Sequence, residues 1–281
     1  MFSASRFSVT PCLFQRGFEM FPVIVVFGRS ISGYAFMGIL GFLASVLYLI
    51  IACRIYRYSF DNAIYISVFS IIGGLIGAKL LYFATIIPDL VQRWPIVLKH
   101  PVKEILPYLY GGMVFYGGLF GAIGAAHAAC RYFNQDLKQL YRILVPVIPL
   151  FAGFGRLGCL MAGCCYGKHT SSAFHIIFKH SPFAPNNIPL IPTQLYEAIF
   201  DFCLFAILSL IGLRSKAKYN SNLLKIYLCL YALFRFTIEF FRGDDVRGIF
   251  LLSTSQWISA AILAILFTSL LRKAVTRHDD V

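Results

Sequence analysis

The chain has 281 residues, a formal net charge of +13, a hydrophobic fraction of 59% and a mean hydropathy of +0.74. This composition excludes a water-soluble protein, because a chain of this length could not bury so much apolar surface. It predicts an integral membrane protein. The basic residues are scattered and accompany no nucleic-acid-binding motif, so we expect no nucleic-acid partner.

Seven apolar segments approach the roughly 20 residues that a helix needs to cross a bilayer. They cover about residues 34–53, 63–87, 112–131, 143–163, 194–213, 223–241 and 250–271. Pro146 and Pro149 should bend the fourth segment. We therefore predict an all-α polytopic membrane protein with about seven transmembrane helices, in which residues 34–272 form a single membrane domain.

The loops between these segments predict the orientation of the chain. One set of connections is short and basic, such as the loop that carries Arg54 and Arg57. Because the positive-inside rule weighs short loops, this set belongs in the cytoplasm. The N-terminal segment 1–33 then lies outside, the tail 273–281 lies in the cytoplasm, and the connection 164–193 belongs to an outer cap.

Arg156 lies near the end of the fourth segment, in the run Gly155-Arg156-Leu157-Gly158. A guanidinium at membrane depth is costly unless an anion or a water-filled cavity receives it. The flanking glycines allow backbone or ligand to come close. We interpret Arg156 as a phosphate-binding residue. The alternative, pairing with a buried acid, requires a carboxylate that this run does not contain.

Two pairs of ionisable residues lie four positions apart, and hence on one helix face, in later segments. Arg235 and Glu239 form one pair in the sixth segment, and Glu197 and Asp201 form the other in the fifth. In a structural interpretation these groups neutralise basic or acidic neighbours. In a functional interpretation, Arg235 joins Arg156 in binding one phosphate through forked hydrogen bonds.

Two further blocks are polar or rich in small residues. Tyr116-Gly117-Gly118 opens the third segment, where close helix packing is a sufficient explanation. Pro192-Thr193-Gln194-Leu195-Tyr196-Glu197 begins the fifth segment, and Thr193 is a suitable cap for that helix. Capping does not explain the polar residues that follow, so we expect them to line a polar cavity.

Three of the eight cysteines, Cys159, Cys164 and Cys165, cluster in the sequence. Their C-x4-C-C spacing is not a recognised ligand pattern, so we predict no metal and no cofactor. A neighbouring arginine lowers the pKa of a thiol, so Arg156 favours the interpretation of these cysteines as reactive thiols.

Together these blocks resemble the prolipoprotein diacylglyceryl transferase family over about residues 30–270. The matching blocks fall in the family's order at 34–37, 73–79, 116–119, 155–167, 192–197, 231–242 and 253–257. The resemblance implies a multi-pass enzyme of the bacterial inner membrane with its active site toward the outer leaflet. It would move a diacylglyceryl group from phosphatidylglycerol to a cysteine thiol of a precursor protein.

The resemblance also implies roles for individual residues. The substrate-binding residues would be Arg156, Tyr34, Tyr196, Tyr231 and Gly167. The catalytic residues would be Arg235, Glu239 and Tyr116.

The chain departs from the family's pattern in several polar positions. Tyr116 stands where the family usually has histidine, and Cys159 and Cys164 stand where it usually has asparagine and glutamate. Neutral tyrosine, with a pKa near 10, is a poor base at neutral pH. Two alternatives therefore stay open: a paralogue with another acceptor, in which Cys164 or Cys165 takes part, and a non-catalytic phospholipid-binding protein.

Overall fold

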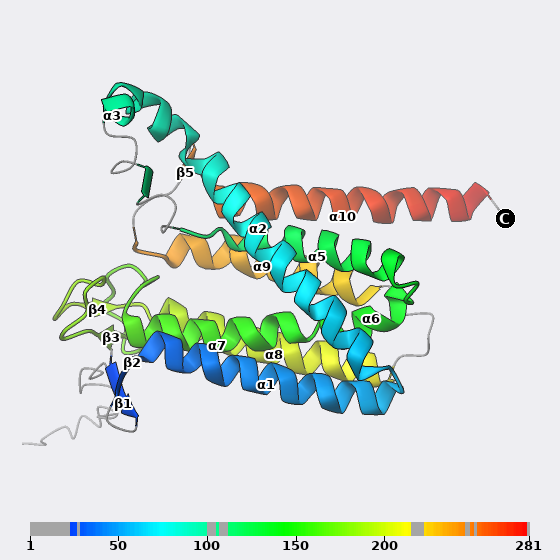
Figure 1. The fold of residues 1–281 in the computed structure, drawn as a ribbon. Helices are drawn as coiled ribbons and strands as arrows, with labels where there is room; N and C mark the ends of the chain where they lie inside the picture. The colour runs from blue at the N-terminus through cyan, green and yellow to red at the C-terminus, as the bar shows by residue number, and fades with distance from the viewer. Residues whose placement is uncertain are drawn as a thin grey trace, which may run out of the picture. The chain divides into compact units, whose positions relative to one another are not determined.

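The structure is a computed structural model that describes residues 23–26, 29–99, 105–106, 112–214, 222–244, 248–249 and 252–279. Most of the expected N-terminal segment 1–33, and the last two residues of the tail, lie outside these ranges. The described chain is mostly helical (Figure 1). Its helices are α1 (Gly33–Tyr56), α2 (Phe60–Gln92), α3 (Trp94–Lys99), α5 (Phe115–Tyr132), α6 (Leu137–Leu144), α7 (Val147–Ala162), α8 (Thr193–Arg214), α9 (Leu223–Ile238), the 3-10 helix η2 (Glu239–Phe241) and α10 (Thr254–Asp279).

Five helical stretches in the described chain are long and apolar enough to cross a membrane. They are Gly33–Tyr56, Phe60–Pro88, Leu137–Ala162, Thr193–Arg214 and Thr254–Arg272. The prediction of a helical, polytopic membrane protein is confirmed in this form. The other two expected crossings correspond to α5, with 18 residues, and α9, with 16.

The proline-containing fourth segment is divided into two helices. α6 ends at Leu144, and α7 begins at Val147 directly after Pro146. Pro149 lies in the first turn of α7. Backbone N–H groups in the first turn have no intrahelical partner, so the N–H that proline lacks costs the helix no hydrogen bond. The bend expected from the two prolines is therefore a helix break with a new helix start.

The strands are short and pair as three separate antiparallel hairpins: β1 (Val23–Val26) with β2 (Arg29–Ser32), β3 (Ile176–Ile177) with β4 (Pro189–Leu190), and β5 (Gly248–Ile249) with β6 (Leu252–Ser253). The β3–β4 hairpin lies in the connection between α7 and α8. It packs its own small core, formed by Leu160, Ile176, Phe178, Ala184 and Leu190. This connection is therefore an ordered cap over the end of α7.

The chain divides into two compact units, and the first combines residues 1–46, 146–210 and 227–281. Aromatic rings connect its helices. Phe154 of α7 packs edge-on against Phe202 of α8 with ring centroids 5.3 Å apart, and Phe200 of α8 stacks on Phe234 of α9 at 3.8 Å. α7, α8 and α9 are thus packed in sequence within this unit.

Backbone hydrogen bonds join the segment after α7 to two distant segments of the same unit. Gly167 N donates to Ile191 O at 3.1 Å, and Lys168 N donates to Phe241 O at 2.8 Å. The approach is so close that a Cβ at Gly243 would lie 2.6 Å from Gly167 O. We call this set of contacts the backbone seam. It fixes the loop that follows α7 against the segment that follows α9.

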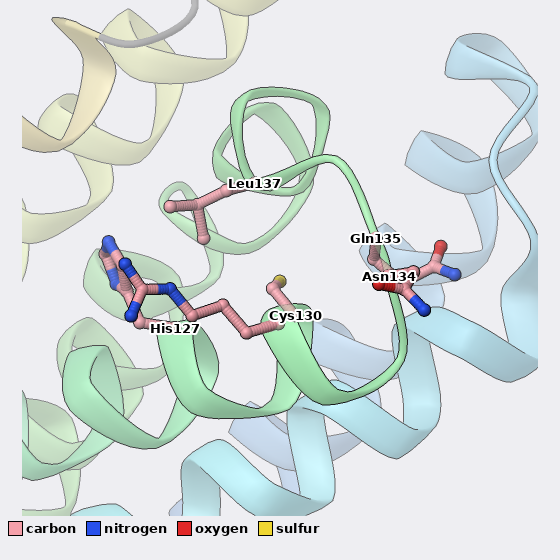
Figure 2. Close-up of a pocket in the computed structure, with 6 residues that line it drawn as sticks. His127, Cys130, Asn134, Gln135 and Leu137 are labelled. Carbon is pink, nitrogen blue, oxygen red and sulfur yellow. The ribbon is translucent and has the colours of Figure 1, made fainter.

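The second unit combines residues 47–145 and 211–226, and its centre is the contact between α2 and α5. A Cβ at Gly73 would lie 2.7 Å from Gly121 O, and one at Gly77 would lie 2.9 Å from Gly121 Cα. The expected close packing at these small residues is confirmed. The unit also has a cavity between the end of α5 and the start of α6, lined by His127, Cys130, Arg131, Asn134, Gln135 and Leu137 (Figure 2).

Candidate active site

The centre of the candidate site is the carboxylate of Glu197, which lies in the first turn of α8 and is only 3% exposed. Three arginines from three segments of the chain surround it. Arg156 Nε forms an ion pair with Oε2, Arg235 Nη1 lies 3.2 Å from Oε1, and Arg242 Nη1 lies 3.9 Å from Oε1. Pairing of Arg156 with a buried acid, the alternative set aside because the run around Arg156 contains no carboxylate, is therefore present, and the acid comes from α8.

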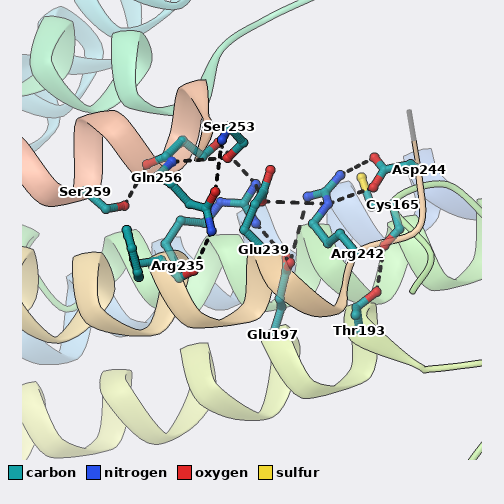
Figure 3. A network of polar contacts seen from close by, with 12 residues as sticks. Cys165, Thr193, Glu197, Arg235, Glu239, Arg242, Asp244, Ser253, Gln256 and Ser259 are labelled. Atoms are coloured by element: carbon teal, nitrogen blue, oxygen red, sulfur yellow. Dashed lines mark hydrogen bonds and ion pairs between the residues drawn. The ribbon is translucent and has the colours of Figure 1, made fainter. Parts of the chain in front are cut away.

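The arginines have further acidic partners that fix their orientation (Figure 3). Arg235 Nη2 lies 2.7 Å from Glu239 Oε2, which confirms the ion pair expected from their i, i+4 spacing. Arg242 contacts both oxygens of Asp244, with Nε donating to Oδ1 at 2.9 Å. The cluster alternates positive and negative groups, so each guanidinium is held in place before any ligand arrives.

The guanidiniums remain partly accessible despite this pairing. The side chain of Arg156 is 18% exposed, and those of Arg235 and Arg242 are each 11% exposed. A buried ion pair that keeps some solvent contact leaves its cation able to bind an incoming anion. The arrangement can therefore receive a phosphate on several fixed N–H donors.

A narrow gap, with no room for a water molecule, lies directly beside Glu197. Its lining includes Arg156, Arg235, Tyr231 and Asp201. Asp201 lies one helical turn after Glu197 and is 3% exposed, and among the described residues its Oδ1 has no hydrogen-bond partner. The start of this helix was expected to line a polar cavity. Glu197 and Asp201 instead border a gap too narrow for water, and Gln194 and Tyr196 are not among its lining residues.

Three further residues selected from the sequence lie in the first unit. Tyr34, at the start of α1, packs against Gly158 of α7, where an added Cβ would lie 3.1 Å from the Tyr34 ring. Tyr196 is 38% exposed on α8, beside Glu197 in sequence. Gly167 belongs to the backbone seam, where a Cβ would lie 2.7 Å from Ile191 Cβ.

Tyr116 belongs to the second unit. It is 2% exposed, near the start of α5, and its ring lies 6.2 Å from that of Phe115 and 6.3 Å from that of Phe120. The described contacts therefore bring Arg156, Arg235, Glu239 and Tyr231 together within the first unit, and those of Tyr116 lie within the second unit.

The three clustered cysteines converge in space. Their Sγ atoms all lie within 4.8 Å of one another, and all three are half-buried free thiols. Gly163 ends α7 with φ 75°, and Cys165 follows with φ 59°. These two left-handed residues turn the chain back, so that Cys164 and Cys165 lie beside Cys159.

Two side chains at the start of α8 hold this turn. Gln194 Nε2 donates to Cys164 O at 2.8 Å, and Thr193 Oγ1 donates to Cys165 O at 2.9 Å. Both side chains are fully buried. Thr193 was expected as a helix cap, whereas the contact recorded for its hydroxyl is the one that fixes the thiol loop.

The surroundings of Cys165 favour its thiolate form. Hydrogen bonds from the Cys159 and Cys164 thiols, together with the positive charges of Arg242 and Arg156, lower the pKa of Cys165 below its ordinary value. The neighbouring Arg242 has its pKa raised, because its hydrogen bonds to Asp244 and the nearby negative charges outweigh burial. For Cys164 the hydrogen bond with Cys159 lowers the pKa, but the hydrogen bond to Cys165 and burial outweigh it, so the pKa of Cys164 is instead raised to about 11. A lowered thiol pKa is therefore limited to Cys165 among the thiols that follow α7.

The sequence analysis did not select Arg242 as a site residue. Arg242 follows η2 and has an extended backbone conformation. The i, i+4 helical spacing that pairs Arg235 with Glu239 therefore does not reach it. The available signal was its position three residues after Glu239, followed by Gly243 and Asp244.

The family model described as prolipoprotein diacylglyceryl transferase matches residues 22–272. The phosphatidylglycerol–prolipoprotein diacylglyceryl transferase of Clostridium tetani is 38% identical over 241 residues, covering 85% of this chain and 92% of the relative. The phosphatidylglycerol–prolipoprotein diacylglyceryl transferase 2 of Clostridium perfringens is 37% identical over 240 residues, covering 85% of this chain and 89% of the relative. That of Rickettsia felis is 37% identical over 66% of each chain. The chain belongs to the prolipoprotein diacylglyceryl transferase family.

Proposed function

We propose that the protein transfers the diacylglyceryl group of phosphatidylglycerol to a cysteine thiol of a prolipoprotein, with release of glycerol phosphate. One observation carries the proposal: three arginines from α7, α9 and the segment after η2 meet at Glu197. The relatives from Clostridium, whose names state this reaction, support the choice of substrates.

The charge distribution of the cluster fits the chemistry of this transfer. Attack of sulfur on the glycerol carbon breaks the C–O bond to phosphate, so negative charge grows on the leaving phosphate oxygens. Donors that are already oriented stabilise this charge without having to reorganise. Arg156 binds the lipid headgroup, Arg235 binds the phosphate, and Glu239 positions Arg235.

The remaining predicted residues complete the substrate site in this proposal. The hydroxyls of Tyr34, Tyr196 and Tyr231 bind the glycerol or the phosphate. Gly167 contributes by letting the loop after α7 approach Ile191 closely, and Tyr116 stands in the sequence where the family usually has histidine.

The proposed placement in the membrane follows from the loop charges and the family. Residues 34–272 form one domain with seven crossings in the bacterial inner membrane. The N-terminal segment lies outside, the tail 273–281 lies in the cytoplasm, and the active site faces the outer leaflet. Phosphatidylglycerol then reaches the site laterally from the bilayer, and the secreted precursor reaches it from outside.

Transfer of labelled diacylglyceryl from phosphatidylglycerol to a peptide carrying the precursor's cysteine tests this proposal. The purified full chain should modify the peptide, and Arg156→Ala should abolish the transfer. Arg54→Ala, which removes an exposed arginine at the end of α1, is the matched control and should retain it. Absence of transfer by the unmodified chain, with phosphatidylglycerol still bound, would contradict the proposal and favour a phospholipid-binding protein.

A further inference from the structure

The spacing of the three clustered sulfurs fits three corners of a metal site. The Sγ atoms of Cys159, Cys164 and Cys165 lie within 4.8 Å of one another. Zinc binds thiolates at about 2.3 Å, so neighbouring sulfurs in a zinc tetrahedron are about 3.8 Å apart. The three sulfurs therefore lie within about 1 Å of the separation that one zinc ion requires.

The backbone already holds the geometry that such a site requires. The carbonyls of Cys164 and Cys165 are fixed by the buried side chains of Gln194 and Thr193. Cys165 has φ 59°, a left-handed conformation that costs a non-glycine residue about 1 kcal/mol or more. Strain of this kind persists where the surroundings enforce it, and here it directs three thiols to one point.

The charges around the cluster match a thiolate-bound cation. A zinc ion with three thiolates carries a net charge of about −1. Arg156 and Arg242 both interact electrostatically with the Cys165 sulfur, so they stabilise a complex with that charge.

The fourth position of the tetrahedron is open. Among the described residues, no further histidine, cysteine or carboxylate joins the three sulfurs. Zinc sites with three protein ligands and one open position are the catalytic kind, because substrate binds at the fourth position.

We propose that Cys159, Cys164 and Cys165 hold a zinc ion whose fourth position takes the sulfur of the incoming prolipoprotein cysteine. This inference rests on the transferase function proposed above. Coordination releases the thiol proton to water and leaves a thiolate. The sulfur then forms its bond to the glycerol carbon, the C–O bond to phosphate breaks, and its electron pair stays on the phosphate oxygen. Zinc remains divalent throughout.

This site would supply the activation of the acceptor thiol that the altered polar residues leave unexplained. Cys159 and Cys164 stand where the family usually has asparagine and glutamate, so the same positions would hold ligands instead of hydrogen-bonding groups. The C-x4-C-C spacing alone predicted no metal, and the inference depends on the left-handed turn that the sequence did not reveal.

Metal analysis of the purified full chain, prepared under reducing conditions and dialysed against zinc, is the first test. We expect about one zinc per chain in the unmodified protein, since three ligands define one ion. Cys159→Ser, Cys164→Ser and Cys165→Ser should each weaken zinc binding at least about tenfold. Cys203→Ser, at an exposed position on α8, is the matched control and should keep the metal. Unchanged zinc content in all three variants would overturn the inference, as would a mass two hydrogens lower with no zinc bound, because that mass indicates a disulfide.

Cobalt substitution of the unmodified chain gives a second test that does not depend on how the variants fold. Cobalt should show thiolate charge-transfer absorption and the visible bands of a tetrahedral site. Adding the cysteine peptide should shift these bands, and the same peptide with serine should not. Identical spectra with both peptides would overturn the assignment of the fourth position.

The two proposals fail in different ways. Zinc binding with the expected spectra, but without any lipid transfer, would contradict the transferase function and leave the metal site. Full transfer after zinc is removed by a chelator would contradict the role of zinc in activating the acceptor thiol and leave the transferase function.

Discussion

Glu197 Oε1 lies 3.2 Å from Arg235 Nη1, although the two residues are 38 positions apart and belong to different helices. The same carboxylate pairs with Arg156 of α7. One acid therefore holds the arginines of two other helices, and the integrity of the site depends on its charge more than on any single arginine.

Glu197→Gln should lower both stability and activity. The substitution keeps the shape of the side chain but leaves two buried guanidiniums without their shared anion. Removing one partner from a buried ion pair typically costs about 3–5 kcal/mol. Thermal unfolding in detergent measures the stability, and the lipid-transfer assay measures the activity. An unfolding midpoint equal to that of the unmodified chain would show that the arginines do not need Glu197.

Arg242→Lys tests whether the fork between Arg242 and Asp244 matters. Lysine keeps the positive charge but cannot contact both carboxylate oxygens as the guanidinium does. We expect transfer to fall by about tenfold, equivalent to about 1.4 kcal/mol. Asp244→Asn, which removes the partner's charge, should have an effect of similar size. If Arg242→Lys transfers at the unmodified rate, charge alone is sufficient at this position.

Gly77→Ala tests the close packing of α2 on α5 in the second unit. The added methyl group would lie 2.9 Å from Gly121 Cα, so the helices must separate. Such overpacking typically costs about 1–3 kcal/mol. Gly124→Ala is the matched control, because a Cβ there meets nothing within 4 Å and alanine favours the helix by about 1 kcal/mol. Equal stabilities for the two variants would refute the packing argument.

Tyr58 should make the second unit less stable at alkaline pH. Burial, and then the nearby Cys130, Cys53 and Asp136, raise the pKa of Tyr58 from 10.0 to about 12. Since the unfolded chain loses this proton first, stability should fall as the pH rises from 10 to 12 and level off above that range. The hydroxyl also donates to Gln135 Oε1 at 3.1 Å.

Tyr58→Phe should remove this part of the pH dependence, and at neutral pH it should cost about 1 kcal/mol for the lost hydrogen bond. Unfolding curves for both proteins at pH 8, 10 and 11.5 measure the difference. Parallel pH profiles would contradict the assignment to Tyr58.

The helical segments could be predicted closely because apolar runs and their ends are local features. The expected segment 194–213 corresponds to α8 at Thr193–Arg214, and the prolines of the fourth segment predicted a bend where the helix breaks. The pair Arg235 and Glu239 could also be predicted, since an i, i+4 spacing fixes a shared helix face.

The convergence at Glu197 could not be predicted, because spacing within one helix says nothing of which helix lies opposite. Three separate segments deliver Arg156, Arg235 and Arg242 to one carboxylate, and that arrangement is a property of the packing. The meeting of the three thiols was hidden for another reason. It depends on φ 59° at Cys165, and a cysteine gives no sign in the sequence that it adopts a left-handed conformation.

The backbone seam is built from peptide groups, which are the same in nearly every amino acid. Lys168 bonds to Phe241, and Gly167 bonds to Ile191, through N–H and carbonyl groups alone. The seam itself is therefore independent of most side chains mounted on it, apart from the glycines that the close approach requires, whereas the thiol turn also depends on Gln194 and Thr193. The side chain at position 164 takes no part in the seam, so the reactivity of this site can change while its architecture stays the same.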